Sequence, residues 1–130
     1  MKTNLTQWQK RVLLVKQIYS QLMRNDNPLV AKKEFASYFY NIDANFIKVF
    51  EYFLDYKEAI IQEISKSILP NWSFDRLSVV DQAILFQSYS EFKTLNVSKI
   101  IIIDQAIITV KKYSVYENYK YINAILEKVL

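Results

Sequence analysis

Glu117, Lys120 and Tyr121 place an acidic group, a cation and an aromatic ring close together near the end of the chain. On a helical wheel Tyr121 falls at the edge of an apolar stripe, so its ring can be partly exposed. Single-stranded RNA is recognised by aromatic rings on which bases stack and by lysines that hold phosphates. The three residues are therefore a candidate RNA contact, although an aromatic residue at helical spacing more commonly lies at the rim of a core.

The amino-terminal quarter of the chain is strongly basic, and the formal net charge of +4 is concentrated there. Between Met1 and Lys33, Asp26 is the one acidic residue, and it faces a set of cations: Lys2, Lys10, Arg11, Lys16, Arg24, Lys32 and Lys33. A basic sector attracts polyanions and supports non-specific binding to phosphates. A solvated helix face is an equally good interpretation of the same pattern.

Arg11 differs from the other cations because a helical wheel puts it on the apolar side, with Trp8 and Val15. A guanidinium beside an apolar face needs either a partner or an exit to water. One interpretation is that the stem of Arg11 packs on Trp8 while its head reaches solvent. The other is that Arg11 contacts a phosphate or a base at the start of the first helix.

Asp81 is the carboxylate with the clearest local role. It follows Ser78 at the spacing of a capping box, with Asp in place of the usual Glu. It also falls in the first turn of an expected helix, where a negative charge interacts well with the helix dipole. The pattern therefore favours a capping role for Asp81.

The composition excludes several kinds of chemistry. The chain has no cysteine, histidine or glycine. Thiol nucleophiles, imidazole bases and zinc sites built from thiolates and imidazoles are therefore absent. Phosphate-binding loops that depend on glycine are absent too. We expect no catalytic site, no metal site and no cofactor, and the protein is predicted not to be an enzyme.

The apolar periodicity predicts an all-α fold, a single compact domain over residues 1–130 with about six or seven helices. At 130 residues and 52% apolar composition, the chain can bury a core of its own. The expected helices are Thr6–Met23, Ala31–Tyr40, a third beginning at an Asp43 N-cap with a break near Asp55, Val79–Leu95, one through Ile100–Ile103, and Glu117–Leu130. Four β-branched residues at Ile100–Ile103 would also suit a strand, but Ser98 as a cap favours a helix.

Charged residues interrupt every apolar stretch before it reaches the length of a membrane span. Lys10, Arg11 and Lys16 also break up any export signal at the start of the chain. We therefore expect a cytoplasmic protein with no membrane partner.

The second half of the chain, from Trp72 to Leu130, contains a series of short motifs in which polar residues interrupt apolar helix faces. They are Asp75-Arg76-Leu77, Asp81-Gln82-Ala83-Ile84-Leu85, Glu91-Phe92, Asp104-Gln105-Ala106-Ile107, Lys111-Lys112-Tyr113 and Tyr121-Ile122-Asn123-Ala124-Ile125-Leu126-Glu127-Lys128. In that order and at those separations the chain resembles the NusB family of transcription antitermination factors. The resemblance implies a NusB-like helical fold.

The resemblance also implies binding of boxA-type single-stranded RNA. Glu117, Lys120 and Tyr121 match a family segment that contacts this RNA. Lys10 and Arg11 stand in the family's arginine-rich motif, where Gln7, Trp8 and Gln9 replace further arginines that are common in relatives.

Ribosomal protein NusE is the protein partner that the resemblance implies. Asp81 matches a position that takes part in binding NusE, and Tyr19 and Leu22 match positions near the same surface. Glu91 matches a family element that we interpret as structural. Core packing is the simpler interpretation of Tyr19 and Leu22.

Two hypotheses of different classes follow. The first is an RNA-binding adaptor that pairs with NusE, holds boxA-type RNA and thereby links ribosomal RNA transcripts to the RNA polymerase antitermination complex indirectly. The second is a non-catalytic helical protein-interaction module with weak or no RNA affinity, which the thinned arginine motif favours. A third, weaker possibility is a targeting piece like the NusB-like domain of some RNA methyltransferases.

Overall fold

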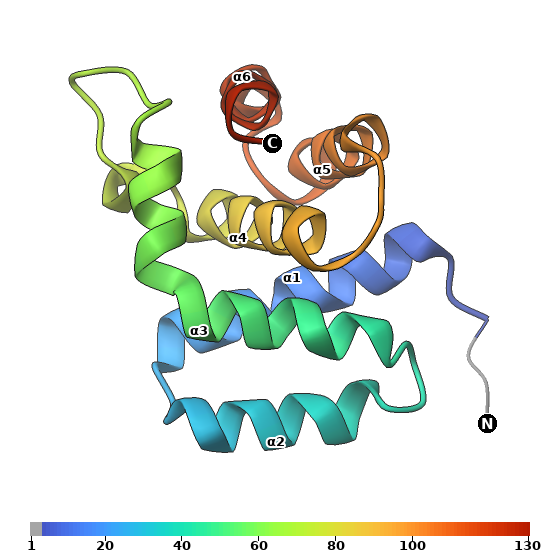
Figure 1. Ribbon diagram of the computed structural model, residues 1–130. Helices are drawn as coiled ribbons and strands as arrows, with labels where there is room; N and C mark the ends of the chain where they lie inside the picture. Colours follow the sequence, from blue (N-terminus) through green and yellow to red (C-terminus); the bar gives the residue numbers. More distant parts are fainter. Residues whose placement is uncertain (1–3) are drawn as a thin grey trace.

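The computed structural model describes residues 4–130, and the all-α prediction is confirmed. The described residues form six α-helices and two short 3₁₀ turns, with no strand among them. Their bounds are α1 Gln7–Arg24, α2 Pro28–Phe39, α3 Asn45–Ser65, η1 Phe74–Arg76, α4 Val79–Thr94, α5 Lys99–Tyr113, η2 Tyr116–Asn118 and α6 Tyr119–Val129 (Figure 1). Of the basic residues discussed above, Lys2 lies outside the described residues.

Capping residues explain where α1 begins and ends. The Thr6 hydroxyl accepts a hydrogen bond from the Gln9 N–H at 3.1 Å, and the Gln9 side chain accepts one from the Thr6 N–H at 2.8 Å. This reciprocal pair is a capping box. At the other end Asn25 adopts the left-handed conformation with φ 53°, which asparagine tolerates better than most residues. The predicted bounds of this helix are accurate to one residue.

The starts of α2 and α3 differ from the prediction. α2 begins at Pro28, three residues before the expected Ala31, because proline fits the first helical position and Asn27 caps the Leu29 N–H at 2.9 Å. The expected N-cap of α3, Asp43, is wrong by one position, since α3 begins after Ala44. Asp43 nevertheless contributes to this end, because its carboxylate accepts the Asn45 N–H at 3.1 Å.

A kink at Tyr56 divides α3 into two parts. Tyr56 has φ −120° and ψ 21°, which departs from helical geometry, at the place where the sequence predicted a break. Figure 1 shows the first part of α3 running beside α2 and the second part rising toward the level of α6. One helix therefore belongs to both halves of the fold.

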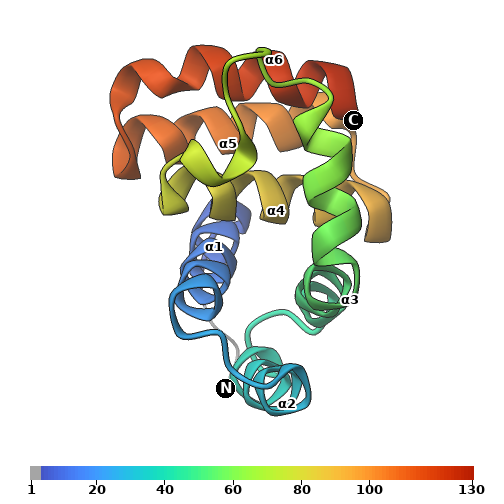
Figure 2. The ribbon, with the colours of Figure 1, turned by 90° about the vertical axis from the view of Figure 1, so that its left-hand side faces the viewer.

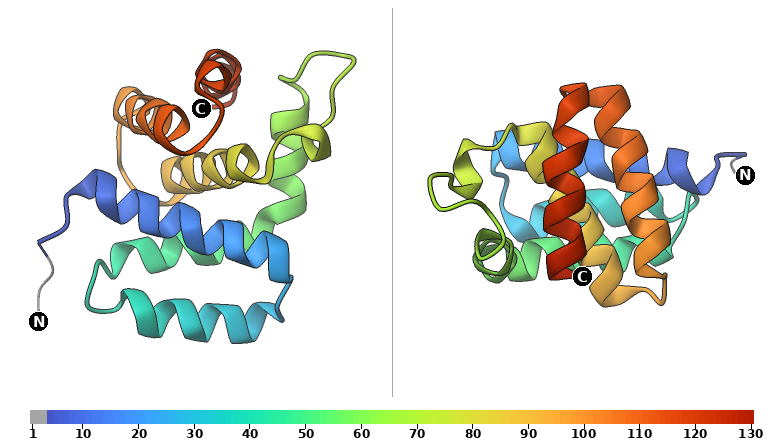
Figure 3. Two further views of the ribbon diagram at one scale, coloured as in Figure 1. Left: turned by 180° about the vertical axis from the view of Figure 1, so that it is seen from behind. Right: turned by 90° about the horizontal axis from the view of Figure 1, so that it is seen from above.

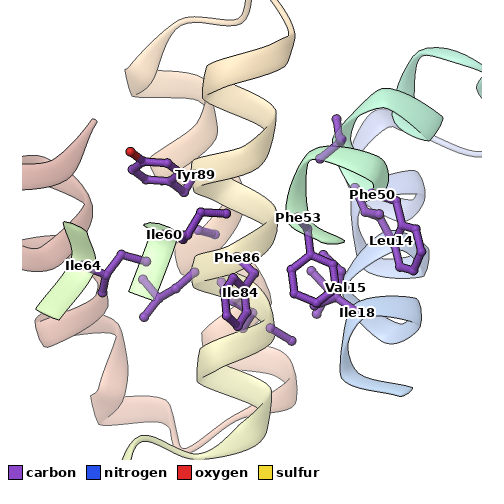
Figure 4. Close-up of a cluster of buried hydrophobic side chains, with 14 of the residues drawn as sticks. Leu14, Val15, Ile18, Phe50, Phe53, Ile60, Ile64, Ile84, Phe86 and Tyr89 are labelled. Atoms are coloured by element: carbon purple, nitrogen blue, oxygen red, sulfur yellow. The ribbon is translucent and has the colours of Figure 1, made fainter. Parts of the chain in front are cut away.

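α4 is the central helix, and it packs against α1, α3, α5 and α6. Every residue from Ala83 to Glu91 is buried. Phe86 meets Phe53 of α3 with ring centroids 4.8 Å apart, within the cluster of apolar side chains drawn in Figure 4. Figure 2 shows α4, α5 and α6 stacked above α1 and α2.

α5 and α6 pack side by side, and α1 passes beneath them (Figure 3). The helical prediction for Ile100–Ile103 is confirmed, and Ser98 caps α5 by accepting the Ile101 N–H at 3.3 Å. The predicted last helix begins two residues later than expected, at Tyr119, because Glu117 lies in the 3₁₀ turn η2.

Among the described residues, the hydroxyls of Ser88 and Ser90 are buried with no hydrogen-bond partner. An unpaired buried hydroxyl costs on the order of 1–3 kcal/mol. We therefore expect the double variant Ser88→Ala with Ser90→Ala to raise the free energy of unfolding by about 1 kcal/mol or more, measured by urea denaturation. The exposed Ser37→Ala in α2 controls for helix propensity, and an equal gain in that control would contradict the assignment.

Candidate nucleic-acid interface

An apolar groove separates α6 from the chain segment that connects α3 to α4. Its volume is about 360 Å³. Ile68, Leu69 and Trp72 line one side, and Tyr121, Ala124 and Lys128 of α6 line the other. Trp72 is 54% exposed, so a large aromatic face is open to solvent at the mouth of the groove. The groove thus has an apolar, partly aromatic lining that can accept a planar ring.

Tyr121 is anchored inside the groove by its hydroxyl, which donates to the Asp81 carboxylate. The same carboxylate accepts from the Ser114 hydroxyl at 2.7 Å and from the Asn118 amide at 2.8 Å. Burial raises the pKa of the Tyr121 hydroxyl well above its ordinary value near 10, and the hydrogen bond to Asp81 and the charge of that carboxylate raise it further. The ring is therefore held neutral and in one orientation.

This arrangement revises the predicted role of Asp81. Its side chain is fully buried, so it offers no surface to a protein partner. The expected capping pattern is half present: the Ser78 hydroxyl accepts the Asp81 N–H at 3.1 Å. The carboxylate itself is bonded to η2, α6 and the end of α5 instead. Asp81 connects the start of α4 to the groove.

Glu117 and Lys120 are exposed and lie close to Tyr121 in the chain. Lys120 lies in the first turn of α6, and Glu117 lies in η2 just before it. The three candidate residues are thus brought together, with Tyr121 facing the groove and the two charged side chains in solvent. Their contact with RNA stays a prediction.

Arg11 has an internal partner. Its guanidinium donates to both carboxylate oxygens of Glu91, with the shortest contact at 2.7 Å, and to the Gln105 side chain at 3.1 Å. Arg11 is 6% exposed and Glu91 is fully buried. The snorkelling interpretation of Arg11 is therefore wrong, and the structural interpretation of Glu91 is supported. A guanidinium held in this way reaches a phosphate only if the ion pair breaks.

Lys10 lies away from the α6 residues. Its ammonium is 3.5 Å from the Asp43 carboxylate in the connection between α2 and α3, which lies below α1 in Figure 1. α6 lies on the opposite side of α1 and α4 in that view. The structure therefore does not join Lys10 and Arg11 to Glu117, Lys120 and Tyr121 in one track.

Tyr19 and Leu22 occupy different environments on α1. Tyr19 is 39% exposed and lines a second hollow of about 180 Å³, together with Lys16 and Tyr113. Leu22 is partly buried against the core. Tyr19 is thus exposed enough to contact a partner, whereas only part of the Leu22 side chain reaches the surface. Their contact with a protein partner stays a prediction.

Trp72 is the groove residue that the sequence did not identify. A tryptophan two residues after Pro70, in a segment with little apolar periodicity, is a signal for an exposed aromatic residue. Its partners in the groove lie about fifty residues later in the chain, so the sequence could not place them beside it.

None of the helices within residues 4–130 has the length and hydrophobicity that a membrane span requires. No group of three or more acidic, histidine or cysteine side chains in that range is arranged to hold a metal ion.

Comparison with known proteins identifies the family. The model of the NusB family matches residues 8–130, almost the whole chain. The chain belongs to the NusB family. The resemblance seen in the sequence is thereby confirmed.

Curated relatives carry the name transcription antitermination protein NusB. The protein from Borreliella burgdorferi is 42% identical over 79 residues, which cover 59% of this chain and 53% of the relative. The protein from Ligilactobacillus salivarius is 34% identical over 77 residues, which cover 59% of each chain. The matches thus span little more than half the length of these NusB proteins.

A solved structure of T. maritima NusB has the same fold as this family member. The two superpose with a TM-score of 0.78, and the alignment covers 99% of this chain and 92% of the other. Because the identity is 24%, this likeness concerns the NusB fold alone.

The raised pKa of Tyr121 predicts how the stability of this NusB family member changes with pH. The folded state holds the hydroxyl proton more tightly than the unfolded state, so the stabilisation is complete below pH 10 and is lost as the pH rises above it. Tyr121→Phe should therefore make the fall in free energy of unfolding between about pH 9.5 and 11.5 less steep. Tyr40→Phe, on an exposed ring, is the control, and equal slopes for both variants would contradict the assignment.

The Arg11–Glu91 pair predicts a large effect on stability. Arg11→Met leaves the Glu91 carboxylate buried without its cation, which should lower the free energy of unfolding by about 3–5 kcal/mol. Arg24→Met removes surface ion pairs with Asp26 and Glu34 and should cost about 1 kcal/mol or less. Both values come from urea denaturation. If the two variants lose similar amounts of unfolding free energy, the buried pair contributes no more to stability than an exposed pair does.

Proposed function

We propose that this NusB family chain is a non-catalytic adaptor in transcription antitermination, which acts in the cytoplasm. It holds boxA-type single-stranded RNA, pairs with ribosomal protein NusE and so links ribosomal RNA transcripts to the RNA polymerase antitermination complex. The observation that carries the RNA part is the groove between Trp72 and Tyr121. The names of the relatives support the antitermination part.

The groove suits a nucleobase for two reasons. Its walls are apolar and aromatic, and stacking on an aromatic side chain contributes roughly 1–3 kcal/mol for each base. Lys128 lines it and Lys120 is exposed on the same helix, so cations lie where the phosphates of a stacked strand pass. A base entering the groove meets a Tyr121 ring already fixed by Asp81, so little side-chain freedom is lost on binding.

The proposed residue set differs from the sequence prediction. Tyr121, Lys120 and Glu117 remain at the RNA surface and Trp72 joins them. Arg11 supports the fold from inside, and Lys10 stays outside this surface.

NusE pairing is proposed through the exposed part of α1. Tyr19 and the edge of Leu22 are the contacts that we expect there. Asp81 contributes indirectly, because it is fully buried and positions Tyr121 rather than touching a partner.

A protein-interaction module without RNA affinity is the second candidate. Two observations favour it. Arg11 is held in a buried ion pair with Glu91, and the neighbouring positions of the arginine-rich motif hold Gln7, Trp8 and Gln9 instead of arginines. This candidate keeps NusE binding and lacks any preference for boxA.

We expect labelled boxA RNA to bind the wild-type chain more tightly than a scrambled RNA of equal length, and more tightly still with NusE present. Trp72→Ala and Tyr121→Ala should each weaken boxA binding about tenfold or more, since the stacking of one base is worth on the order of 1.4 kcal/mol. The measurement is fluorescence anisotropy at two salt concentrations.

Tyr40→Ala is the matched control, because Tyr40 is a highly exposed aromatic residue at the end of α2. Circular dichroism checks that each variant is folded. Equal binding of boxA and scrambled RNA would refute the specific RNA role. Retained NusE binding with no RNA binding at low salt would establish the interaction module in its place.

A further inference from the structure

Three lysines lie over aromatic rings on the surface formed by α1, the end of α5 and η2. Lys112 Nζ is 5.4 Å from the centre of the Trp8 ring and 5.8 Å from that of Tyr113. Lys16 Nζ is 5.4 Å from the Tyr113 ring. The third, Lys111, lies over the rings of Tyr116 and Tyr119. Each distance is within the range of a cation–π contact.

Lys111 lies between the rings of Tyr119 and Tyr116, with its Nζ 4.4 Å and 5.3 Å from their centres. The two rings meet edge to face with centroids 5.7 Å apart. Together these contacts form the lysine–aromatic strip, defined by Trp8, Lys16, Lys111, Lys112, Tyr113, Tyr116 and Tyr119.

The strip is a fixed part of the fold. The Trp8 indole N–H donates to the Thr109 hydroxyl at 3.0 Å, which ties the start of α1 to α5. Tyr119, at the other end, is the first residue of α6, two positions before Tyr121. The strip therefore runs from α1 across the last turn of α5 and reaches the helix that forms one wall of the groove.

The lysines of the strip form no close ion pairs with the described part of the chain. Within residues 4–130, Lys16, Lys111 and Lys112 have no acidic partner within 4.0 Å, whereas Lys32 and Lys99 pair with Asp55 and Glu127. All three strip lysines are exposed. A cation over a ring keeps most of its N–H donors free, so each ammonium remains able to bind an anion.

Single-stranded RNA fits this combination better than an acidic protein surface does. A carboxylate needs the cations alone, whereas an RNA strand uses cations for its phosphates and exposed rings for its bases. Tyr113 and Tyr116 are about half exposed and supply such rings.

We propose that the lysine–aromatic strip is a second RNA track, in which Lys16, Lys111 and Lys112 bind phosphates of a single strand and Tyr113 and Tyr116 stack its bases. The track carries the strand beyond the groove, from the start of α6 toward α1. Its α1 end borders the proposed NusE contact, because Lys16 and Tyr113 share a hollow with Tyr19. It rests on the proposed function in one respect, namely that the ligand is RNA. It does not require a preference for boxA.

The test uses oligouridylate, a single strand without a boxA sequence, in a short and a long form. The variant combines Lys16→Gln, Lys111→Gln and Lys112→Gln. The control combines Lys33→Gln, Lys48→Gln and Lys57→Gln, which lie on α2 and α3 and change the net charge equally. The dissociation constant is measured by anisotropy over a series of salt concentrations.

For a single strand, the slope of log affinity against log salt falls by about 0.7 for each phosphate that the protein no longer neutralises. With the long oligouridylate we expect the strip variant to reduce this slope by about 2, because three lysines are removed, and the control to keep the wild-type slope. With the short form, which one surface can hold, the reduction should be smaller. Circular dichroism excludes unfolding of α5, whose last turn contains two of the three lysines.

Equal slopes for the strip variant and the control would overturn the strip, and so would the absence of oligouridylate binding by the wild type at low salt. If the strip variant loses NusE binding but keeps the wild-type salt slope for RNA, the proposal is also overturned, because the strip is then a protein-binding surface. The proposed boxA role fails separately, when Trp72→Ala leaves boxA binding unchanged or when boxA and scrambled RNA bind alike.

Discussion

The burial of α4 requires internal partners for its two carboxylates, and those partners determine where the surrounding helices lie. A buried carboxylate without a cation or hydrogen-bond donors would cost several kcal/mol, comparable with the whole stability of a small domain. Glu91, near one end of α4, is satisfied by Arg11 of α1, which also bonds Gln105 of α5. Asp81, near the other end, is satisfied by Ser114, Asn118 and Tyr121. The apolar core supplies most of the driving force, and these two polar centres fix the arrangement of the helices.

The sequence was most informative where structure is local. Ser78 and Ser98 cap helices at the predicted places, and the break in α3 lies one residue from its predicted position. It also showed that Arg11 stands on an apolar face and so needs either a partner or an exit to water. It could not name Glu91, because the two lie eighty residues apart and only the crossing of α1 and α4 joins them.

The candidate site was predictable only in its α6 part. Lys120 and Tyr121 are neighbours in the chain, whereas Trp72 joins them through the packing of a loop against α6. The sequence predicted a capping role for Asp81 from its position in the first turn of a helix. It could not show the three hydrogen-bond donors, which lie more than thirty residues later in the chain. The rings that Lys111 and Lys112 contact come from four separate elements, α1, α5, η2 and α6, so no single stretch of sequence contains the strip.

The kink at Tyr56 determines where one wall of the groove lies. The first part of α3 is held by α2, and the second part leads into the loop that carries Trp72. A straight α3 would deliver that loop to a different place, and the groove would lose one wall. The bend is made without glycine, by a half-exposed residue that does not line the groove. A residue change that straightens α3 at Tyr56 would therefore displace one wall of the groove, although Tyr56 itself does not line it.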